Sequence, residues 1–220
     1  MPKFRICLSV VQQVRARAFY SSLFLTQCVK KDAKVYIADF KGGVDFPPIW
    51  HTKCSLLTDE KTLHKVLVSI TDELQNRKQI LRTAGVANID EYNRNAEKKL
   101  YRIVFACDEI AEVLDKTGLS KQQKDEILKI ESELSIIARQ GRAFGIHLVL
   151  ATQRPDATIL NGQIRNNIDT RICGRADNVL SQIILDNTDA SDKIAKSSQG
   201  RFLTNSGKIF QAYWFDENIL

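Results

Sequence analysis

The chain has no long hydrophobic segment. None of its apolar runs approaches the roughly 20 residues that span a bilayer. The N-terminus also lacks the pattern of a secretory signal peptide. The sequence therefore predicts a soluble domain in the cytoplasm, or at the inner face of the membrane if a missing segment or a partner attaches it there.

Cysteines with the spacing of metal or redox motifs are missing as well. The five cysteines are an odd number, and no two stand in a CxxC arrangement. Cys107 and Cys173 lie in apolar runs, where a cysteine behaves as a small hydrophobic residue. We expect reduced thiols, neither disulfides nor metal ligands.

Charge of one sign is not gathered in any tail. The net charge of +6 permits contact with a polyanion, but Lys and Arg are spread along the whole chain. A length of 220 residues with 44% hydrophobic content is enough for one sizeable core. We expect a single globular domain, and charge alone does not identify its partner.

An apolar run with a polar tip stands at residues 145–155 (GIHLVLATQRP). Such runs, bounded by Gly and Pro, are typical of strands buried on both faces, and ligands bind beyond the carboxyl ends of parallel strands. This places Thr152, Gln153 and Arg154 at a candidate site. An amide both donates and accepts hydrogen bonds, so Gln153 suits sensing a γ-phosphate or orienting a water. The alternative is a capping or turn amide.

A second run of the same kind, residues 101–109 (YRIVFACDE), ends in two carboxylates. A phosphate-transfer site needs one carboxylate that holds Mg²⁺ directly or through water and a neighbour that polarises the attacking water. Asp108 and Glu109 fit these two roles. The alternative is an acidic strand-to-helix junction, where the helix dipole favours Glu109.

Strand and helix patterns alternate along the chain, which predicts an α/β fold with a mostly parallel sheet flanked by helices. The other predicted elements are a strand at 34–39, a helix of about twenty residues starting near Thr58, a loop at 116–124, a helix with its apolar stripe at 127–138, a weak helix at 159–168, a strand at 170–174, a helix at 179–185 and a C-terminal β-hairpin at 200–215.

Several collinear segments resemble the FtsK/SpoIIIE DNA-translocating motors, a family of RecA-like hexameric ATPases with the P-loop NTPase fold. The similarity runs from about residue 35 to residue 214, and the FKGG turn at 40–43 resembles the motors of conjugative and integrative elements. The specific matches are AGVANIDEYN at 84–93, the DE strand, RAFGIHLVLATQRPDATILNGQIRNNIDTRI at 142–172 and IILD at 183–186.

The resemblance implies an ATP- and Mg²⁺-dependent motor that acts on double-stranded DNA, as a hexameric ring or with partner motor subunits. Asp108 and Glu109 resemble the Walker B pair, with Mg²⁺ held by Asp108 through water. Thr152, Gln153 and Arg154 resemble the sensor segment.

The same resemblance assigns roles outside the two apolar runs. Arg142 is similar to the arginine that reaches a neighbouring subunit's nucleotide. Asp39 and Lys41 match the Asp and Lys of the turn after the family's second strand, with Phe40 in place of the usual proline.

Residues 159–167 are the candidate DNA-facing loop, with Arg165, Asn166 and Asn167 as its polar side chains. The alternative is an ordinary polar helix surface. His51, His64 and His147 are interpreted as structural residues.

A phosphate loop is missing where the resemblance requires one. The GxxxxGK[ST] pattern depends on glycines that let backbone N–H groups wrap the β-phosphate. The first glycine of this chain is Gly42, and residues 9–18 read SVVQQVRARA. Residues 200–209 (GRFLTNSGKI) have the wrong spacing. We therefore expect ATP binding to be impaired, with residues 1–33 a degenerate or frame-shifted segment and residues 34–220 the remainder of one motor domain.

Codon degeneracy offers an explanation of the missing loop. In a shifted frame, synonymous codons for residues 10–18 can spell GxTGSGKS, which is a phosphate loop at the expected place. The hypothesis is that residues 5–24 are a frame-shifted translation. The alternative is a divergent N-terminus whose codons happen to permit the pattern.

Three functional hypotheses follow from these observations. The first is an ATP-driven motor on duplex DNA. The second is a non-hydrolysing RecA-like homologue that assembles on DNA or with an intact motor. The third is an unrelated phosphatase or nucleotide transferase that uses Asp108 and Glu109 on small substrates without assembly.

Overall fold

The computed structural model describes residues 7–10, 14–41, 46–153, 162–195 and 197–212. Helices and strands alternate along the described chain. In order they are β1 (Cys7–Val10), α1 (Val14–Val29), β2 (Lys34–Ala38), α2 (Pro48–Lys53), β3 (Ser55–Leu57), α3 (Glu60–Thr83), α4 (Ile89–Asn95), β4 (Ile103–Cys107), α5 (Ile110–Leu114), α6 (Lys121–Gln140), the 3₁₀ turn η1 (Arg142–Phe144), β5 (Ile146–Thr152), α7 (Gly162–Asn166), β6 (Thr170–Cys173), α8 (Asn178–Leu185), α9 (Asp189–Lys193), β7 (Arg201–Thr204) and β8 (Ile209–Gln211).

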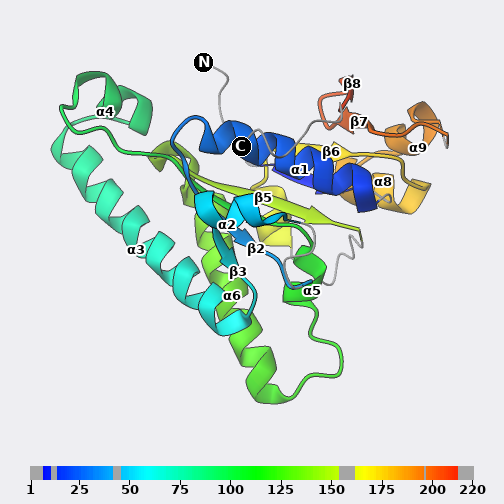
Figure 1. Cartoon of the computed structure of the whole chain (residues 1–220), viewed down its shortest axis with the longest axis horizontal. Coiled ribbons are helices and arrows are strands. Elements are labelled where there is room, and N and C mark those ends of the chain that lie inside the picture. Colours follow the sequence, from blue (N-terminus) through cyan, green and yellow to red (C-terminus); the bar gives the residue numbers. More distant parts are fainter. Residues whose placement is uncertain (1–6, 11–13, 42–45, 154–161, 196, 213–220) are drawn as a thin grey trace.

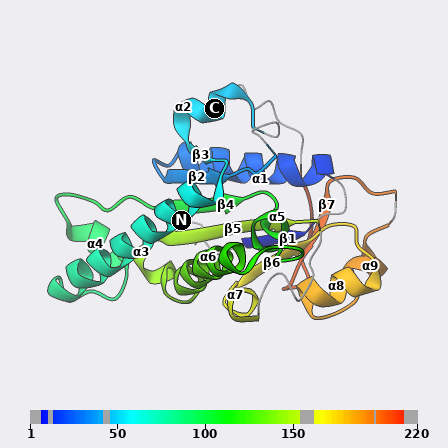
Figure 2. The ribbon, with the colours of Figure 1, turned by 90° about the horizontal axis from the view of Figure 1, so that it is seen from below.

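One sheet organises the fold, with the strand order β3-β2-β4-β5-β1-β6-β7-β8 (Figure 1). The strands from β3 to β6 in this order are parallel, and β7 and β8 continue the sheet as an antiparallel hairpin. The predicted α/β fold with a mostly parallel sheet and a C-terminal β-hairpin is confirmed. Figure 2 shows helices on both sides of the sheet, with α1 and α2 on one side and α3, α5, α6 and α7 on the other.

The alternation of side chains along the strands divides the core between these two layers. On β2, Val35 and Ile37 pack with Leu25 of α1 and Trp50 of α2. On the other face, β2, β4 and β5 contribute side chains to the larger cluster under α3 and α6. Both β4 and β5 are buried along their whole length, as apolar runs without polar alternation predict for central parallel strands.

Two helix starts differ from the sequence prediction. The helix predicted to start near Thr58 is α3, which starts at Glu60. Its N-cap is Asp59, whose carboxylate accepts a hydrogen bond from the backbone N–H of Thr62. The predicted loop at 116–124 is shorter, because Ser120 and Gln123 form a capping box that starts α6 at Lys121. The elements β1, α1, α2, β3, α4, α5 and α9 were not predicted.

The N-terminal segment supplies a central strand of the sheet. β1 lies between β5 and β6, in parallel register with both, and α1 begins four residues after β1 ends. Val10, the last residue of β1, therefore lies at the carboxyl edge in the middle of the sheet. None of the described helices has both the length and the apolar character needed to cross a bilayer.

Candidate functional site

The carboxyl ends of β2, β4 and β5 bring most of the predicted site residues to one edge of the sheet. Asp39 follows β2, Asp108 and Glu109 follow β4, and Thr152 is the last residue of β5. The three strands are neighbours in the sheet, and the register pairs Val10, the end of β1, with Thr152. This edge therefore adjoins the β1–α1 junction, where ligands of open α/β sheets bind.

Glu109 is held by the end of the neighbouring strand. Thr152 Oγ1 donates a hydrogen bond of 2.5 Å to Glu109 Oε1, and the backbone N–H of Gln153 donates one of 2.9 Å to Glu109 Oε2. Glu109 also caps α5, at 3.4 Å from the backbone N of Ala111. Glu109 is 8% exposed and Thr152 is 1% exposed. The carboxylate is thus oriented by the end of β5 and by the first turn of α5.

Asp108 and Asp39 are joined through one lysine. Lys41 Nζ lies 4.0 Å from Asp108 Oδ2, and the backbone N–H of Lys41 donates a hydrogen bond of 2.9 Å to Asp39 Oδ1. Asp39 and Asp108 are both buried, and Asp39 Oδ2 has no hydrogen-bond partner among the described residues. A buried carboxylate oxygen without a donor can accept a hydrogen bond from a metal-bound water.

The residues at this edge fit Mg²⁺ if the phosphates of a nucleotide supply part of its coordination. The described residues contain no group of three His, Cys, Asp or Glu side chains that could hold a metal ion by themselves. Mg²⁺ is commonly held by one or two carboxylates together with substrate phosphates and water. Asp108, with Asp39 beside the same lysine, provides carboxylates of that kind.

Arg142 does not lie with these residues. It stands in η1, before the start of β5, and the seven residues of β5 separate it from Thr152 by roughly 20 Å. Its guanidinium pairs with Asp169, and its side chain is 61% exposed. The structure therefore excludes a role of Arg142 at the nucleotide edge of its own chain.

The remaining predicted site residues are Arg154, Arg165, Asn166 and Asn167. Arg154 lies outside the described residues. Arg165, on α7, is half-buried and lies 3.5 Å from the carbonyl oxygen of Ile183 on α8, whereas Asn166 is exposed. Asn167 donates a hydrogen bond of 2.7 Å to the carbonyl oxygen of Gln163. For Arg165 to contact DNA, its guanidinium would have to give up its contact with the carbonyl oxygen of Ile183 on α8.

His147 has the structural environment expected from the sequence. It is buried on β5, and its pKa is lowered from 6.5 to about 4, first by burial and then by the charges of Arg102, Arg77 and Arg142. The side chain is therefore neutral at pH 7, and Arg102 Nη1 lies 3.4 Å from its Nε2.

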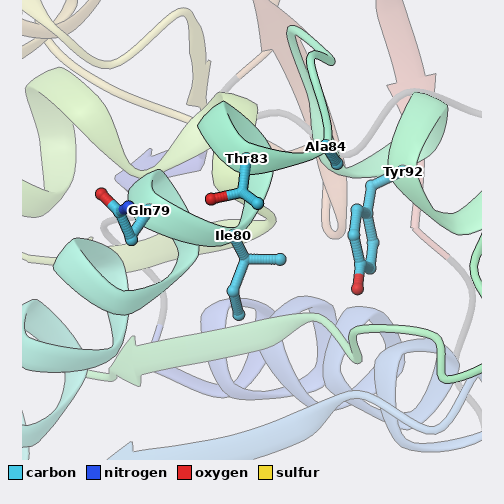
Figure 3. A pocket seen from close by; sticks show the side chains of 5 residues that line it. All are labelled: Gln79, Ile80, Thr83, Ala84 and Tyr92. Atoms are coloured by element: carbon cyan, nitrogen blue, oxygen red, sulfur yellow. The ribbon is translucent and has the colours of Figure 1, made fainter.

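A hollow of about 340 Å³ lies elsewhere, at the corner between α3 and α4 (Figure 3). Its lining has no charged side chain: Gln79, Ile80, Thr83, Ala84 and Tyr92. It is unsuited to a phosphate, so the carboxylate edge stays the candidate site.

The contacts around Glu109 could not be inferred from the sequence. The hydrogen bond from Thr152 to Glu109 joins residues 43 positions apart, and no local pattern identifies such a pair. The buried Arg77 of α3 also lacks a sequence signal, because arginines on helices are usually exposed.

No protein-family model matches the chain. Among curated proteins, it is 32% identical over 156 residues to the DNA translocase FtsK of Chlorobaculum tepidum, covering 70% of this chain and 18% of that protein. It is also 32% identical over 177 residues to the DNA translocase FtsK of Chlamydia muridarum, covering 73% of this chain and 21% of that protein. The chain thus spans about a fifth of the length of these relatives.

Solved structures give the same grouping. The conjugation coupling protein TcpA of pCW3, solved as a monomer with ATPγS, has a TM-score of 0.91 at 35% identity, covering 99% of this chain and 62% of that chain. EssC (ATPases 2 and 3) of Geobacillus thermodenitrificans shares the fold with a TM-score of 0.73 at 21% identity, covering 98% of this chain and 41% of that chain. By sequence and by fold, this chain belongs to the FtsK/SpoIIIE family and has the RecA-like P-loop NTPase fold.

Proposed function

We propose that the chain is a motor domain that couples ATP to the movement or transfer of double-stranded DNA. The observation that carries this proposal is the buried cluster of Asp39, Asp108 and Glu109 at the edge that adjoins the β1–α1 junction. The proposal is supported by the relatives, which are named as DNA translocases and as a conjugation coupling protein.

Each residue of the cluster has a proposed task. When Mg²⁺ is bound with ATP, it neutralises charge on the β- and γ-phosphates. Asp108 would hold that ion through water, with Lys41 and Asp39 beside Asp108. Glu109 polarises the attacking water, and Gln153 senses the γ-phosphate. Thr152 acts through Glu109, since its hydroxyl hydrogen bonds to that carboxylate.

The proposed assembly is a hexameric ring of this chain, or a ring shared with partner motor subunits, working in the cytoplasm. In this proposal Arg142 reaches the nucleotide of a neighbouring subunit, which its 61% side-chain exposure supports. DNA contact through Lys and Arg would be to phosphates and independent of sequence. Arg165, Asn166 and Asn167 stay the proposed DNA-facing residues, and Arg154 the proposed end of the sensor segment.

Hydrolysis is proposed to be impaired in the chain as it stands. The residues between the described ends of β1 and α1 are Val11, Gln12 and Gln13, and none is the glycine that a phosphate loop needs. We propose that this segment is a frame-shifted or degenerate phosphate loop within residues 1–33. Sequencing the locus through its first thirty codons tests the frameshift: a stop codon or absent glycine codons in the shifted frame would exclude it.

The absence of glycine before Gly42 favours a second candidate, a non-hydrolysing homologue that assembles on DNA or with an intact motor. Purified chain with a restored phosphate loop, tested for binding to duplex DNA with and without ATP, separates the two. If the chain is a motor, the restored protein shows an ATP-dependent rise in Tm and ATP hydrolysis that DNA stimulates. The non-hydrolysing homologue binds DNA with no response to ATP. Turnover of small phosphate esters without assembly would support a phosphatase instead.

A further inference from the structure

The turn that carries Arg142 is rigidly built. Backbone hydrogen bonds from Phe144 and Ile146 to the carbonyl oxygen of Gly141 close it, at 3.0 Å each. Gly145 follows in the left-handed region, with φ of 73°. Arg142 stands at the exposed end of this turn, paired with Asp169. Its position therefore depends on whatever holds the turn against the rest of the domain.

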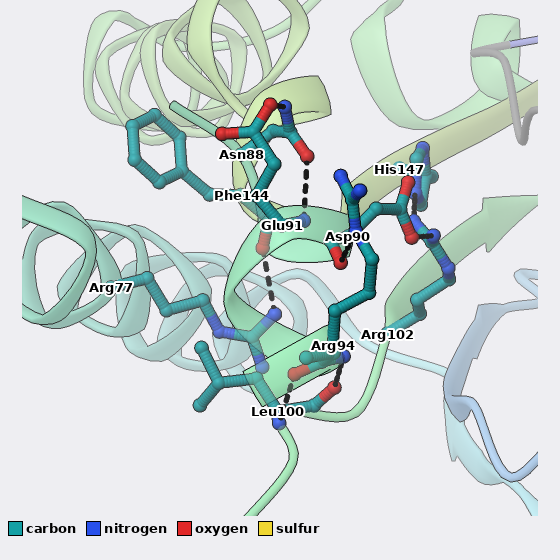
Figure 4. A network of polar contacts seen from close by, with 10 residues as sticks. Arg77, Asn88, Asp90, Glu91, Arg94, Leu100, Arg102, Phe144 and His147 are labelled. Atoms are coloured by element: carbon teal, nitrogen blue, oxygen red, sulfur yellow. Dashed lines mark hydrogen bonds and ion pairs between the residues drawn. The ribbon is translucent and has the colours of Figure 1, made fainter. Parts of the chain in front are cut away.

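Arg77 of α3 holds the turn from inside. Its side chain is fully buried, and its Nη1 donates a hydrogen bond of 2.8 Å to the carbonyl oxygen of Phe144. Its Nε lies 2.7 Å from Glu73 Oε1, and its guanidinium lies over the ring of Tyr101 at 5.2 Å from the centroid. Only arginine offers donors in this fixed fork together with a flat face that stacks on a ring. The contact with Phe144 is drawn in Figure 4.

Ile89, the first residue of α4, presses on the same turn. A Cβ on Gly145 would meet Ile89 Cδ1 at 2.5 Å, so the two residues are in close contact. The start of α4 is itself fixed, because Asn88 Oδ1 accepts from the backbone N–H of Glu91 at 3.0 Å and Glu91 Oε2 accepts from the backbone N–H of Ala87 at 2.9 Å.

Further contacts tie α4 to the segment that leads into β4 and to β5. Arg102 Nη2 lies 2.5 Å from Asp90 Oδ1, and Arg102 Nη1 lies 3.4 Å from His147 Nε2 on β5. Asn93 exchanges two hydrogen bonds of 2.8 Å with the backbone of Leu100. Figure 4 shows Asp90 of α4 beside Arg102, with His147 next to Arg102. The segment 84–93 (AGVANIDEYN), singled out in the sequence but without a role at the carboxylate edge, thus serves the opposite edge.

We propose that Arg77 is a positioning residue for Arg142, and that residues 84–93 form with it a brace that fixes the Arg142 turn. This inference rests on the proposed role of Arg142 at a neighbouring subunit's nucleotide. A side chain that acts across a subunit boundary needs a rigid backbone at its own position. If that backbone is mobile, its conformational entropy must be lost before the side chain reaches its working geometry. Glu73, Arg77 and Ile89 provide that base through contacts that never reach the nucleotide.

Hydrogen exchange on the purified chain tests the brace without any need for ATP. Arg77→Met removes the donor to Phe144 and is expected to accelerate exchange at the amides of residues 144–146 roughly tenfold. Arg82→Met, at an exposed arginine of the same helix, is the matched control and leaves these amides unchanged. Unchanged exchange in Arg77→Met would overturn the proposal. If Arg77→Met does not fold, Glu73→Gln, which weakens the grip on Arg77, must accelerate the same amides or the proposal fails.

Steady-state kinetics distinguishes a failure of the proposed brace from a failure of the proposed role of Arg142. In a chain whose phosphate loop is restored, Arg77→Met is expected to lower kcat for ATP with little change in KM, and Arg77→Lys to recover part of the loss. The loss must disappear in an Arg142→Ala background; a full loss in that background overturns the positioning role. If Arg142→Ala leaves kcat unchanged while exchange still responds to Arg77→Met, the role of Arg142 in trans fails and the brace stands.

Discussion

Thr152 donates its hydroxyl hydrogen to Glu109 Oε1 across 2.5 Å, joining the ends of two neighbouring strands of the sheet. Gln153 adds its backbone N–H to the other oxygen of the same carboxylate. A hydrogen-bond donor on each oxygen fixes the direction of the carboxylate. The segment predicted to sense phosphate therefore acts on the group predicted to polarise water.

Removing the Thr152 hydroxyl tests this relationship. Thr152→Val keeps the shape of a buried side chain but loses a hydrogen bond to a charged group, which costs about 1.5–3 kcal/mol of unfolding free energy. Thr152→Ser keeps the hydroxyl and is expected to recover most of that loss. Urea unfolding of the three proteins measures the difference, and equal stability of the Val and Ser variants would contradict the hydrogen bond.

Two glycines with similar backbone angles provide a matched pair. Gly145 and Gly85 have φ of 73° and 66°, but a Cβ on Gly145 would lie 2.5 Å from Ile89 Cδ1, whereas one on Gly85 would have nothing within 4 Å. Gly85→Ala should cost about 1–2 kcal/mol for its left-handed backbone alone. Gly145→Ala should cost more, because Ile89 must also move. Chemical denaturation measures both, and equal losses would show that Ile89 does not press on the turn.

His147 makes stability depend on pH. Burial, with the charges of Arg102, Arg77 and Arg142, lowers its pKa from 6.5 to about 4. Between these two pH values the imidazole is therefore protonated in the unfolded chain but stays neutral in the folded chain. The stabilisation is complete above pH 6.5 and is lost as the pH falls from 6.5 towards 4, by about 3 kcal/mol at most.

Unfolding free energies of wild type and His147→Gln, measured from pH 7 to pH 4, reveal this contribution as a difference between the two curves. His51→Gln, at an exposed histidine, is the control and should follow the wild type. Parallel curves for wild type and His147→Gln would mean that His147 titrates normally.

Sequence patterns predicted the parts of the fold that local residue patterns determine. The apolar runs gave β4 and β5, and parallel topology placed Asp108 and Thr152 at one edge. The start of α6 at Lys121 was also within reach, since Ser120 and Gln123 have capping-box spacing. The strand β1 was missed because four residues carry too little pattern to tell a strand from a helix.

The remaining features arise from contacts between distant segments. Arg77 and Phe144 are 67 positions apart, and only packing of α3 beneath η1 reveals their hydrogen bond. Thr152 and Glu109 meet through strand register, which depends on the whole sheet. Neither pair has a local signature, because the residue types involved are common on exposed helices and at strand ends.

The proposed ATP site of a DNA motor is the edge formed by Asp39, Asp108 and Glu109. ATP hydrolysis, with and without duplex DNA, tests this site in three proteins: the chain as it stands, a chain whose residues 5–24 are replaced by the shifted-frame translation that contains GxTGSGKS, and that restored chain carrying Glu109→Gln. We predict hydrolysis only in the restored chain, stimulated by DNA and reduced at least a hundredfold by Glu109→Gln. Absence of hydrolysis in the restored chain, or hydrolysis that survives Glu109→Gln, would rule out this ATP site.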